Sequence, residues 1–385
     1  MSIRTNAPRM KIAWALAASL LLPAAAGAQT LNVATAGDQN MVDYIKDYLG
    51  PMFEKANPGV KVVAVGTGPG DSGSQKIYEK LSAQKGANAD NWDFDVIVAH
   101  QKMSGQMVSE GLLAKYREKI ATGSLVTSST ASNALGTNVD GFVMPMFQSQ
   151  TAIAYNPDMV KAPPATYTEL REWVKVNPKK FGYNGIKGGM SGVAFTAGWV
   201  YAFGGDAEKL MKGPYDAATK ASWDAALGEL KAFNQNVVIT PGNAGTLDML
   251  NRGEIAMGPV WVDMFYTWMN DGKLPPTMKL KLLSPGMPGQ PMYYAVPAKA
   301  AQPDLAAKFI AMATSPQVQA DGIVKKFNWY PGIDAKYLQG KLDDATWKKL
   351  FSDLTPDDLS KNAKPFPIAP YFNDILESYE KKVVN

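Results

Sequence analysis

A regular alternation of apolar strands and helices in the first hundred residues constrains this chain the most. Apolar and β-branched runs at residues 31–35, 60–65 and 93–99 predict short strands. Between them, apolar side chains recur at helical spacing over 41–53 and 74–84, which predicts helices. Strands that alternate with helices pair most simply in parallel, because each helix returns the chain across one face of the sheet. This region therefore predicts an α/β fold.

The rest of the chain continues this mixture with longer loops. Residues 141–154 form a strand-like run, and Thr168 is expected to cap a helix that Pro178 ends. Further helices are predicted at 193–203, 217–234, 246–252, 303–314 and 315–326, and further strands at 254–258 and 293–297. We therefore expect α/β structure throughout, in mostly parallel sheets flanked by helices.

The length allows two lobes, and the order of the predicted elements places the boundary between them. The 385 residues give room for two ordinary domains, and an apolar fraction of 46% is that of a globular protein. The expected N-terminal lobe is 29–147 plus about 285–345, and the expected C-terminal lobe is 148–284 plus about 346–385. The expected hinge lies near 145–155 and 284–292, where the chain crosses between the lobes. Since such sheets hold ligands beyond the carboxyl ends of their strands, two facing lobes predict a ligand cleft.

The scarcity of cysteine and histidine excludes several kinds of site. The chain has no cysteine, which excludes disulfides, thiolate nucleophiles and cysteine-bound metal centres. A single histidine excludes sites that need two imidazoles. The net charge of +4 is small for this length and no basic block occurs, so we expect no nucleic-acid partner. The acidic pairs at 343–344 and 357–358 stand at predicted helix starts, where capping explains them, so we expect no metal site. We also expect no cofactor.

The first residues read as an export signal. Basic residues precede an apolar run at 12–22, and Ala26-Gly27-Ala28 has the small-residue pattern of a cleavage site. We expect a signal peptide at 1–28, cleaved after Ala28, and a soluble mature protein without a lipid anchor. A retained N-terminal anchor is the alternative, although the apolar run is short for a membrane span. Either Met1 or Met10 is the start of the chain.

Short segments along the mature chain are similar, in order and spacing, to those of a known family. They are FEKANPGVKV at 53–62, FDVI at 94–97, IAYNPD at 153–158, PATYTEL at 164–170, LNRGEIAM at 250–257, AKFI at 307–310 and SPQVQ at 315–319. Together they resemble the periplasmic solute-binding proteins of ABC importers, of the family 1 extracellular solute-binding type. The resemblance covers essentially the whole mature chain. It implies a two-lobed, type II-like periplasmic-binding-protein fold that closes over a solute and performs no chemistry, so the protein is not expected to be an enzyme.

A glycine-rich loop at 66–74 follows one predicted strand and opens a helix. Backbone N–H groups at such a helix start suit a phosphate, sulfate or carboxylate. Pro69 lacks an N–H and Asp71 repels anions, so a surface turn is the alternative. From this loop and the turn after the first strand, the expected contacts are Asp38, Asn40, Thr67, Asp71, Ser72 and Ser74.

Polar and aromatic side chains near other predicted strand ends complete the candidate site. His100 and Gln101 follow a strand, where an imidazole and an amide suit hydroxyl groups, and a histidine bonded within the protein is the alternative. Gln148, Ser149 and Gln150 lie at the expected crossover. The remaining candidates are Ser191, Trp199, Trp261, Asp263, Trp329 and Tyr330. Indole rings stack on sugars or cations, and a carboxylate binds hydroxyls or an ammonium, while a place in the core is the alternative for each aromatic residue.

These features predict a binding protein for a small polar solute, which we expect to be a sugar, polyol or related carbohydrate. A phosphorylated sugar, an organic acid or a polyamine is the alternative ligand. The resemblance implies an inner-membrane permease and ATPase as partners and periplasmic localisation, and we expect a monomer.

Two other classes of function remain open. One is a periplasmic hydrolase that uses Ser72 and His100. The string GDSG at 70–73 is similar to the nucleophile segment of chymotrypsin-like proteases, but those enzymes place the base histidine before the serine, whereas His100 follows it. The other is a chemoreceptor-linked sensor that binds a solute without feeding an importer.

Overall fold

The computed structural model describes residue 1 and residues 29–68 and 70–384. The predicted signal peptide at 1–28 lies outside the described residues except for Met1. Within the described part of the chain, no helix combines the length and apolar character needed to cross a membrane.

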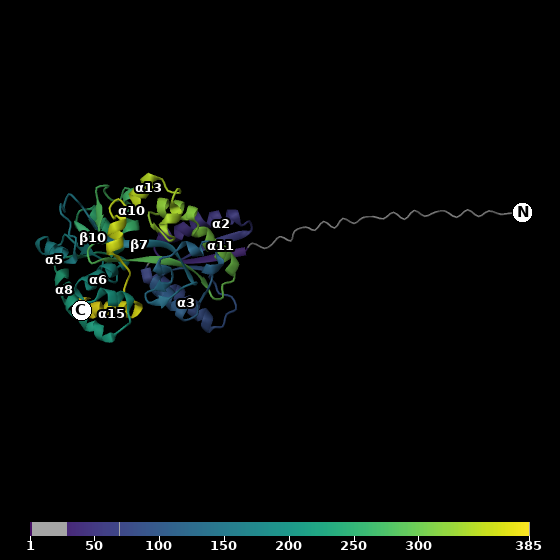
Figure 1. The fold of residues 1–385 in the computed structure, drawn as a ribbon, viewed down its shortest axis with the longest axis horizontal. Helices are drawn as coiled ribbons and strands as arrows, with labels where there is room; N and C mark the ends of the chain where they lie inside the picture. Colours follow the sequence, from purple (N-terminus) through teal and green to yellow (C-terminus); the bar gives the residue numbers. More distant parts are fainter. Residues whose placement is uncertain (2–28, 69, 385) are drawn as a thin grey trace.

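The described residues form short strands and helices in alternation (Figure 1). The strands are β1 (Gln29–Ala36), β2 (Val60–Gly68), β3 (Val96–His100), β4 (Leu113–Ala114), β5 (Asn133–Ala134), β6 (Thr137–Asn138), β7 (Val143–Tyr155), β8 (Gly182–Tyr183), β9 (Val238–Ile239), β10 (Met257–Trp261), β11 (Lys279–Lys281), β12 (Met287–Pro297), β13 (Tyr330–Pro331) and β14 (Ala363–Lys364). The α-helices are α1 (Gln39–Asp43), α2 (Gly50–Ala56), α3 (Gly70–Gly86), α4 (Gln101–Ser109), α5 (Tyr167–Val176), α6 (Met190–Phe203), α7 (Ala207–Lys212), α8 (Lys220–Asn234), α9 (Gly242–Asn251), α10 (Val262–Asn270), α11 (Pro303–Ala313), α12 (Pro316–Val318), α13 (Asp344–Leu350), α14 (Pro356–Asn362) and α15 (Ala369–Tyr379). π-Helical turns η1 (Tyr44–Leu49), η6 (Gln319–Lys326) and η8 (Glu380–Val384) extend three of these helices.

The first lobe is built as the sequence predicts. Strand β1 pairs in parallel with both β2 and β3, and α3 packs against all three strands. The side chains of β3 are buried along its whole length, as expected for a parallel strand covered on both faces. The α/β fold class is therefore confirmed, and the carboxyl ends of β1, β2 and β3 lie at one edge of the sheet.

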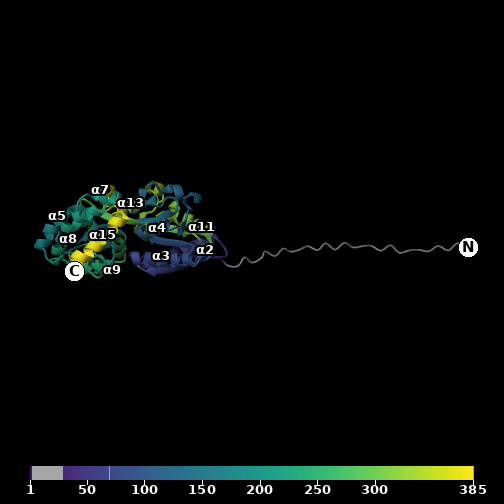
Figure 2. The same ribbon diagram turned by 90° about the horizontal axis from the view of Figure 1, so that it is seen from below.

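Two long strands join the lobes. The main sheet has the order β10-β7-β12-β3-β1-β2, with β7 and β12 antiparallel at its centre. Because the chain enters the second lobe on β7 and returns on β12, these two strands run in opposite directions. Figure 1 shows β7 between α5, α6 and α8 at one end of the molecule and α2, α3 and α11 at the other, and Figure 2 shows the same division from below.

The pairing in the second lobe corrects one expectation. We expected a mostly parallel sheet there, but β10 and β11 are both antiparallel to β7. Among the described residues, parallel pairing in this lobe is limited to short contacts, such as β8 with β9 and β12 with β14. The reason is that β7 continues from the first lobe as the central strand, and the chain returns beside it in the opposite direction.

Two separate hydrophobic cores underlie the two lobes. One contains buried side chains from β1, β3, the first part of β7, the last part of β12 and α11. The other contains side chains from the last part of β7, α5, α6, α8, β10 and α15. On β7 the change occurs between Phe147 and Ala152, and on β12 it occurs between Met287 and Met292. The two crossing strands are thus shared by both cores.

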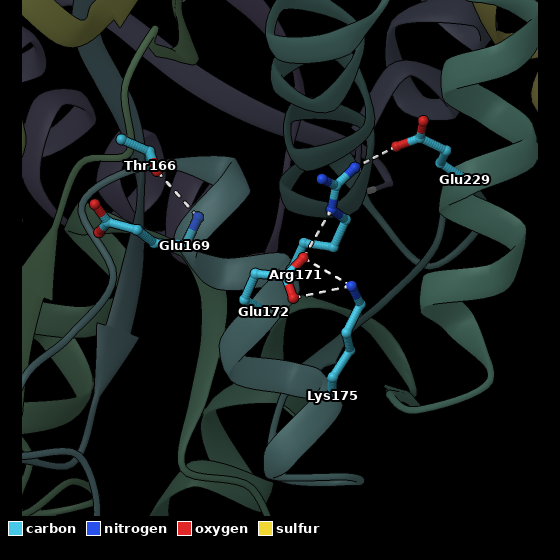
Figure 3. Close-up of polar contacts among 6 residues, drawn as sticks. All are labelled: Thr166, Glu169, Arg171, Glu172, Lys175 and Glu229. Atoms are coloured by element: carbon cyan, nitrogen blue, oxygen red, sulfur yellow. Dashed lines mark hydrogen bonds and ion pairs between the residues drawn. The ribbon is translucent and has the colours of Figure 1, made fainter.

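The surface helix α5 shows how local sequence fixes an element boundary (Figure 3). Its cap is Thr166 rather than the expected Thr168, because Thr166 has an extended backbone and its hydroxyl accepts the N–H of Glu169 at 3.0 Å. Arg171 then pairs with Glu229 of α8, and Lys175 lies 2.7 Å from Glu172. The Arg171–Glu229 pair joins α5 to α8, whereas the Lys175–Glu172 pair lies within α5, whose buried residues are Tyr167, Leu170 and Val174.

Candidate functional site

A cavity of about 1090 Å³ lies between the two lobes. The first lobe lines it with residues from 37–43 and 70–72 and with His100 and Lys102. The second lobe lines it with residues from 186–193, 241–244 and 261–273, together with Leu376, and the crossing strands add Phe147, Ser149, Gln290 and Met292. The volume suits a small organic solute.

The cavity lies where several helices begin. The first residues of α1, α3 and α4 line it from the first lobe, and those of α6, α9 and α10 line it from the second. Helix starts carry unpaired N–H groups and a partial positive charge. Three carboxylates stand at these starts, because Asp38 precedes α1 while Asp71 and Asp263 lie in the first turns of α3 and α10. Acids and helix dipoles therefore meet around the same space.

Eight of the predicted contact residues line this cavity. They are Asp38, Asn40, Asp71, Ser72, His100, Ser149, Trp261 and Asp263. All of them stand at a strand end, at the start of the following helix or on a crossing strand. Most of them were predicted from the rule that ligands bind beyond the carboxyl ends of strands.

The histidine is held by a buried serine. His100 is only 7% exposed, and its backbone N–H donates to Ser74 Oγ at 3.0 Å. Its ring Nδ1 also lies 3.0 Å from the same oxygen. Burial lowers the pKa of His100 below its ordinary value, and the charges of Asp71 and Asp38 oppose that shift. The imidazole is therefore neutral at neutral pH.

The second-lobe carboxylate is buried and hydrogen-bonded. Asp263 is 7% exposed and accepts a hydrogen bond from the hydroxyl of Ser149, on the crossing strand β7. Burial raises the pKa of Asp263 above its ordinary value, while the bond from Ser149 lowers it. Loss of hydration likewise raises the pKa of Asp38, and the neighbouring His100 opposes this. A bound cation would relieve the cost of holding these charges out of water.

Two of the three lysines that line the cavity form ion pairs with other carboxylates. Lys187 pairs with Glu380 at 2.8 Å, and Lys273 pairs with Asp271 at 3.0 Å. The ammonium of Lys102 lies 5.6 Å from the ring centre of Phe372. In contrast, no described residue forms an ion pair with the carboxylates of the first turns or of the α1 start, and one oxygen of Asp71 is buried without a partner. The unneutralised charge of the cavity is therefore negative.

Apolar surface in the cavity comes mainly from the second lobe. Trp261 at the end of β10 and Met264 and Trp268 of α10 line it, and Met190 and Val193 line it from α6. Trp261 is 8% exposed and belongs to a small third cluster that also contains Phe372 of α15. An indole can stack on a sugar ring or on a cation.

Nine other predicted residues do not line the cavity. They are Thr67, Ser74, Gln101, Gln148, Gln150, Ser191, Trp199, Trp329 and Tyr330. Most of the polar members instead bond within the protein: Gln101 to Tyr293, Gln148 to Thr130, Gln150 to the backbone of Met287, Ser191 to Asn243, and Thr67 to the backbone of Thr35 and Gly73.

The two buried tryptophans among these nine belong to the cores. Trp199 is fully buried in the second core, where its indole N–H donates to the carbonyl of Ala226 at 2.8 Å. Trp329 stacks on Phe147 with ring centres 4.3 Å apart, and Phe147 itself lines the cavity. Tyr330 stacks on Phe351 at 5.9 Å. Whether a tryptophan lies in the core or lines the cavity depends on packing, and the local sequence did not distinguish Trp199 and Trp329 from Trp261.

The sequence analysis missed several lining residues. They include Gln39, Lys102, Gly188, Gly189, Asn243, Met264, Trp268 and Gln290. The glycine-rich segment at 182–192 and the Pro241-Gly242 pair were visible signals of tight turns before α6 and α9. Their place in the wall depends on how the second lobe faces the first. Among the described residues, no group of three or more metal-ligating side chains converges.

A comparison with family models decides what kind of protein carries this cleft. The model described as bacterial extracellular solute-binding protein matches residues 50–350, which is most of the chain. The chain belongs to this family of solute-binding proteins. No curated protein matches it significantly. The predicted resemblance to solute-binding proteins is confirmed.

Solved structures of distant solute-binding proteins share the fold. An iron-bound HitA from Pseudomonas aeruginosa is 20% identical, with 92% of this chain and 99% of that chain covered and a TM-score of 0.63. A putative spermidine/putrescine ABC transporter from Listeria monocytogenes is 17% identical, with 91% and 99% covered and a TM-score of 0.65. A structure described as the Atu4243–GABA receptor is 21% identical, with 91% and 96% covered and a TM-score of 0.64. These likenesses confirm the two-lobed fold of this solute-binding protein.

Proposed function

We propose that this protein is the periplasmic binding component of an ABC importer and that it captures a small solute bearing an ammonium group. The observation that carries the proposal is the set of three carboxylates, Asp38, Asp71 and Asp263, that face one cavity without an ion-pair partner among the described residues. Two of the three lysines that line the cavity, Lys187 and Lys273, have carboxylate partners elsewhere, and the three carboxylates outnumber Lys102. A cationic ligand complements this wall, whereas an anion would meet repulsion.

The energetics favour a cation in the closed cleft. Closure removes water, which strengthens each charge–charge contact because the effective dielectric constant falls. The face of Trp261 adds a cation–π contact of about 0.5–2 kcal/mol. The start of α10 therefore supplies both an aromatic face and a carboxylate to the same ligand group. Two of the solved relatives, described as a spermidine/putrescine transporter and a GABA receptor, are named for amine-bearing solutes, which agrees with this choice.

A sugar or polyol is the second candidate. Gln290, Ser149 and Asn40 line the cavity and offer neutral donors and acceptors for hydroxyl groups, and an indole face suits a sugar ring. The sequence alone favoured this ligand. Carboxylates also bind pairs of hydroxyl groups, but a neutral ligand would leave the negative charges of the cavity unneutralised. An organic acid or a phosphorylated sugar would have to rely on the helix starts alone.

A hydrolase based on Ser72 and His100 is less well supported. Nδ1 of His100 lies against Ser74, a fully buried serine that no solute reaches. This contact takes up Nδ1, so this nitrogen is not available as a general base for Ser72. We therefore propose binding without turnover, and we propose β7 and β12 as the hinge because both strands pass from one core to the other.

The remaining parts of the proposal follow from this role. The leader at 1–28 is cleaved after Ala28, the mature monomer works in the periplasm, and a membrane permease with its ATPase receives the closed, loaded form. The lobes are residues 29–147 plus about 285–345, and 148–284 plus about 346–385.

A thermal-shift screen of the mature protein tests the ligand class. The panel contains diamines, amino alcohols, amino acids, neutral sugars, sugar phosphates and organic acids at equal concentrations. A ligand at a hundred times its Kd stabilises the folded state by about 2.7 kcal/mol, which raises Tm by several degrees. We expect amine-bearing members to raise Tm the most. If only neutral sugars raise Tm, the second candidate, a sugar or polyol, is the ligand class. If only organic acids or sugar phosphates raise Tm, both the ammonium ligand and the neutral sugar are refuted.

Small-angle scattering tests the closure. With the best ligand of the screen we expect a smaller radius of gyration than in the unliganded protein, since the lobes move together around the hinge. An unchanged radius at saturating ligand would contradict closure without touching the ligand class.

A further inference from the structure

The single histidine of this chain is presented to the cleft in a defined way. Its ring has two nitrogens, and which of them carries the proton decides whether the cleft meets a donor or an acceptor. Nε2 bonds to no described residue and is not among the fully buried atoms that lack a partner, while the ring lines the cavity. Nε2 is therefore the nitrogen that a solute reaches.

The hydrogen bonds of Ser74 decide where the proton sits. Ser74 is fully buried, and its oxygen accepts the backbone N–H of His100 at 3.0 Å. The hydroxyl proton of Ser74 has one acceptor within reach among the described residues, which is Nδ1 at 3.0 Å. If Nδ1 carried a proton instead, the serine oxygen would receive two donors and its own buried proton would have no acceptor. An unsatisfied buried donor costs free energy, so the first arrangement is favoured.

We propose that Ser74 is a positioning residue that donates to Nδ1 of His100 and thereby keeps the imidazole proton on Nε2, facing the cleft. His100 is then a fixed hydrogen-bond donor in the wall that also carries Asp38 and Asp71. If the proposed function is right, this donor also predicts a second feature of the ligand. A solute that places its ammonium among the carboxylates also presents an acceptor, such as a hydroxyl or carboxylate oxygen, to His100.

Because the chain has one histidine, nuclear magnetic resonance can read this state without assignment. The mature protein is labelled with nitrogen-15 histidine, and long-range proton–nitrogen spectra are recorded at neutral pH without ligand. We expect the proton on Nε2 in an excess of about tenfold, which one hydrogen bond of ordinary strength supplies. A spectrum with the proton on Nδ1, or with both forms equally populated, overturns the inference.

Three variants separate positioning from general stability. In Ser74→Ala we expect the excess of the Nε2 form to fall several-fold, and in Ser74→Thr, which keeps the hydroxyl, we expect it to return. Ser82→Ala is the matched control, because Ser82 lies on the same helix and its hydroxyl is buried without a partner. An excess that Ser74→Ala leaves unchanged contradicts the proposed role.

The two proposals fail separately. A proton on Nδ1 in the unliganded protein refutes the role of Ser74 and leaves the thermal-shift result intact. A screen in which no amine stabilises the protein refutes the ammonium ligand, and the histidine spectrum is unaffected by that outcome.

Discussion

The two walls of the cleft are built from different materials. The first-lobe wall is polar, with Asp38, Asp71 and a histidine that a buried serine holds. The second-lobe wall is mostly apolar, with the indole of Trp261 beside one buried carboxylate, Asp263. Charge recognition is shared by both walls, whereas shape recognition comes mainly from the second. The comparison implies that changes in the second wall weaken binding more than equivalent changes in the first.

The largest effect is expected from Asp263→Asn. The substitution keeps the acceptor for Ser149 but removes a charge that is 7% exposed. Loss of one partner of a desolvated charge pair costs about 2–5 kcal/mol. We expect the affinity for the best amine of the screen to fall by about 30-fold or more, measured by titration calorimetry. An unchanged Kd would remove Asp263 from the site and would favour a neutral ligand.

The next effect separates the tryptophan of the wall from a tryptophan of the core. Trp261→Ala removes the aromatic face, and we expect it to weaken binding by about 1–3 kcal/mol. Trp199→Phe is the control, because Trp199 is fully buried in the second core. We expect that variant to lower Tm and to leave Kd unchanged. Equal losses of affinity in both variants would mean that the lobe as a whole, rather than the cavity face, had been disturbed.

The fold was predictable where its signals are local. β1, β2 and β3 and the helices between them follow from apolar runs and helical spacing, so the sequence predicts the first α/β unit well. The pairing of β7 with β12 could not be predicted from such signals, because the strands are more than a hundred residues apart and register depends on the assembled cores. For the same reason the antiparallel partners of β7 were not foreseen.

The candidate site follows the same division. Asp71, His100 and Asp263 could be proposed because each stands directly after a predicted strand or at the helix start that follows it. Trp268 and Asn243 could not, because they enter the cavity only through the packing of α10 and α9. Aromatic residues are ambiguous in any sequence of this kind. The sequence around Trp199 gave no sign that this residue lies in the core while Trp261 lines the cavity, and only the packed structure distinguishes the two.

A smaller effect is expected on the first wall. Asp71 is only half-buried, so water screens its charge more than that of Asp263. Exposed ion pairs are worth about 0.2–1 kcal/mol, so Asp71→Asn should weaken amine binding by no more than about fivefold. The measurement is the same calorimetric titration, repeated at high salt. A loss as large as that of Asp263→Asn would reverse the order of the two walls.

The last prediction concerns stability rather than affinity, and pH supplies its test. Since burial raises the pKa of Asp263 in the folded protein, folding stabilises its protonated form more than its charged form, compared with the unfolded chain. The contribution of this group to the free energy of unfolding is therefore complete below the ordinary pKa of an aspartate and is lost as the pH rises through the raised value. Asparagine carries no charge, so unliganded Asp263→Asn should melt above the unsubstituted protein at neutral pH, and the gap should close in acid. If the difference in Tm between the two proteins widens as the pH falls, the hydrogen bond from Ser149 outweighs burial. The fold would then stabilise the charged form of Asp263 even without a bound cation.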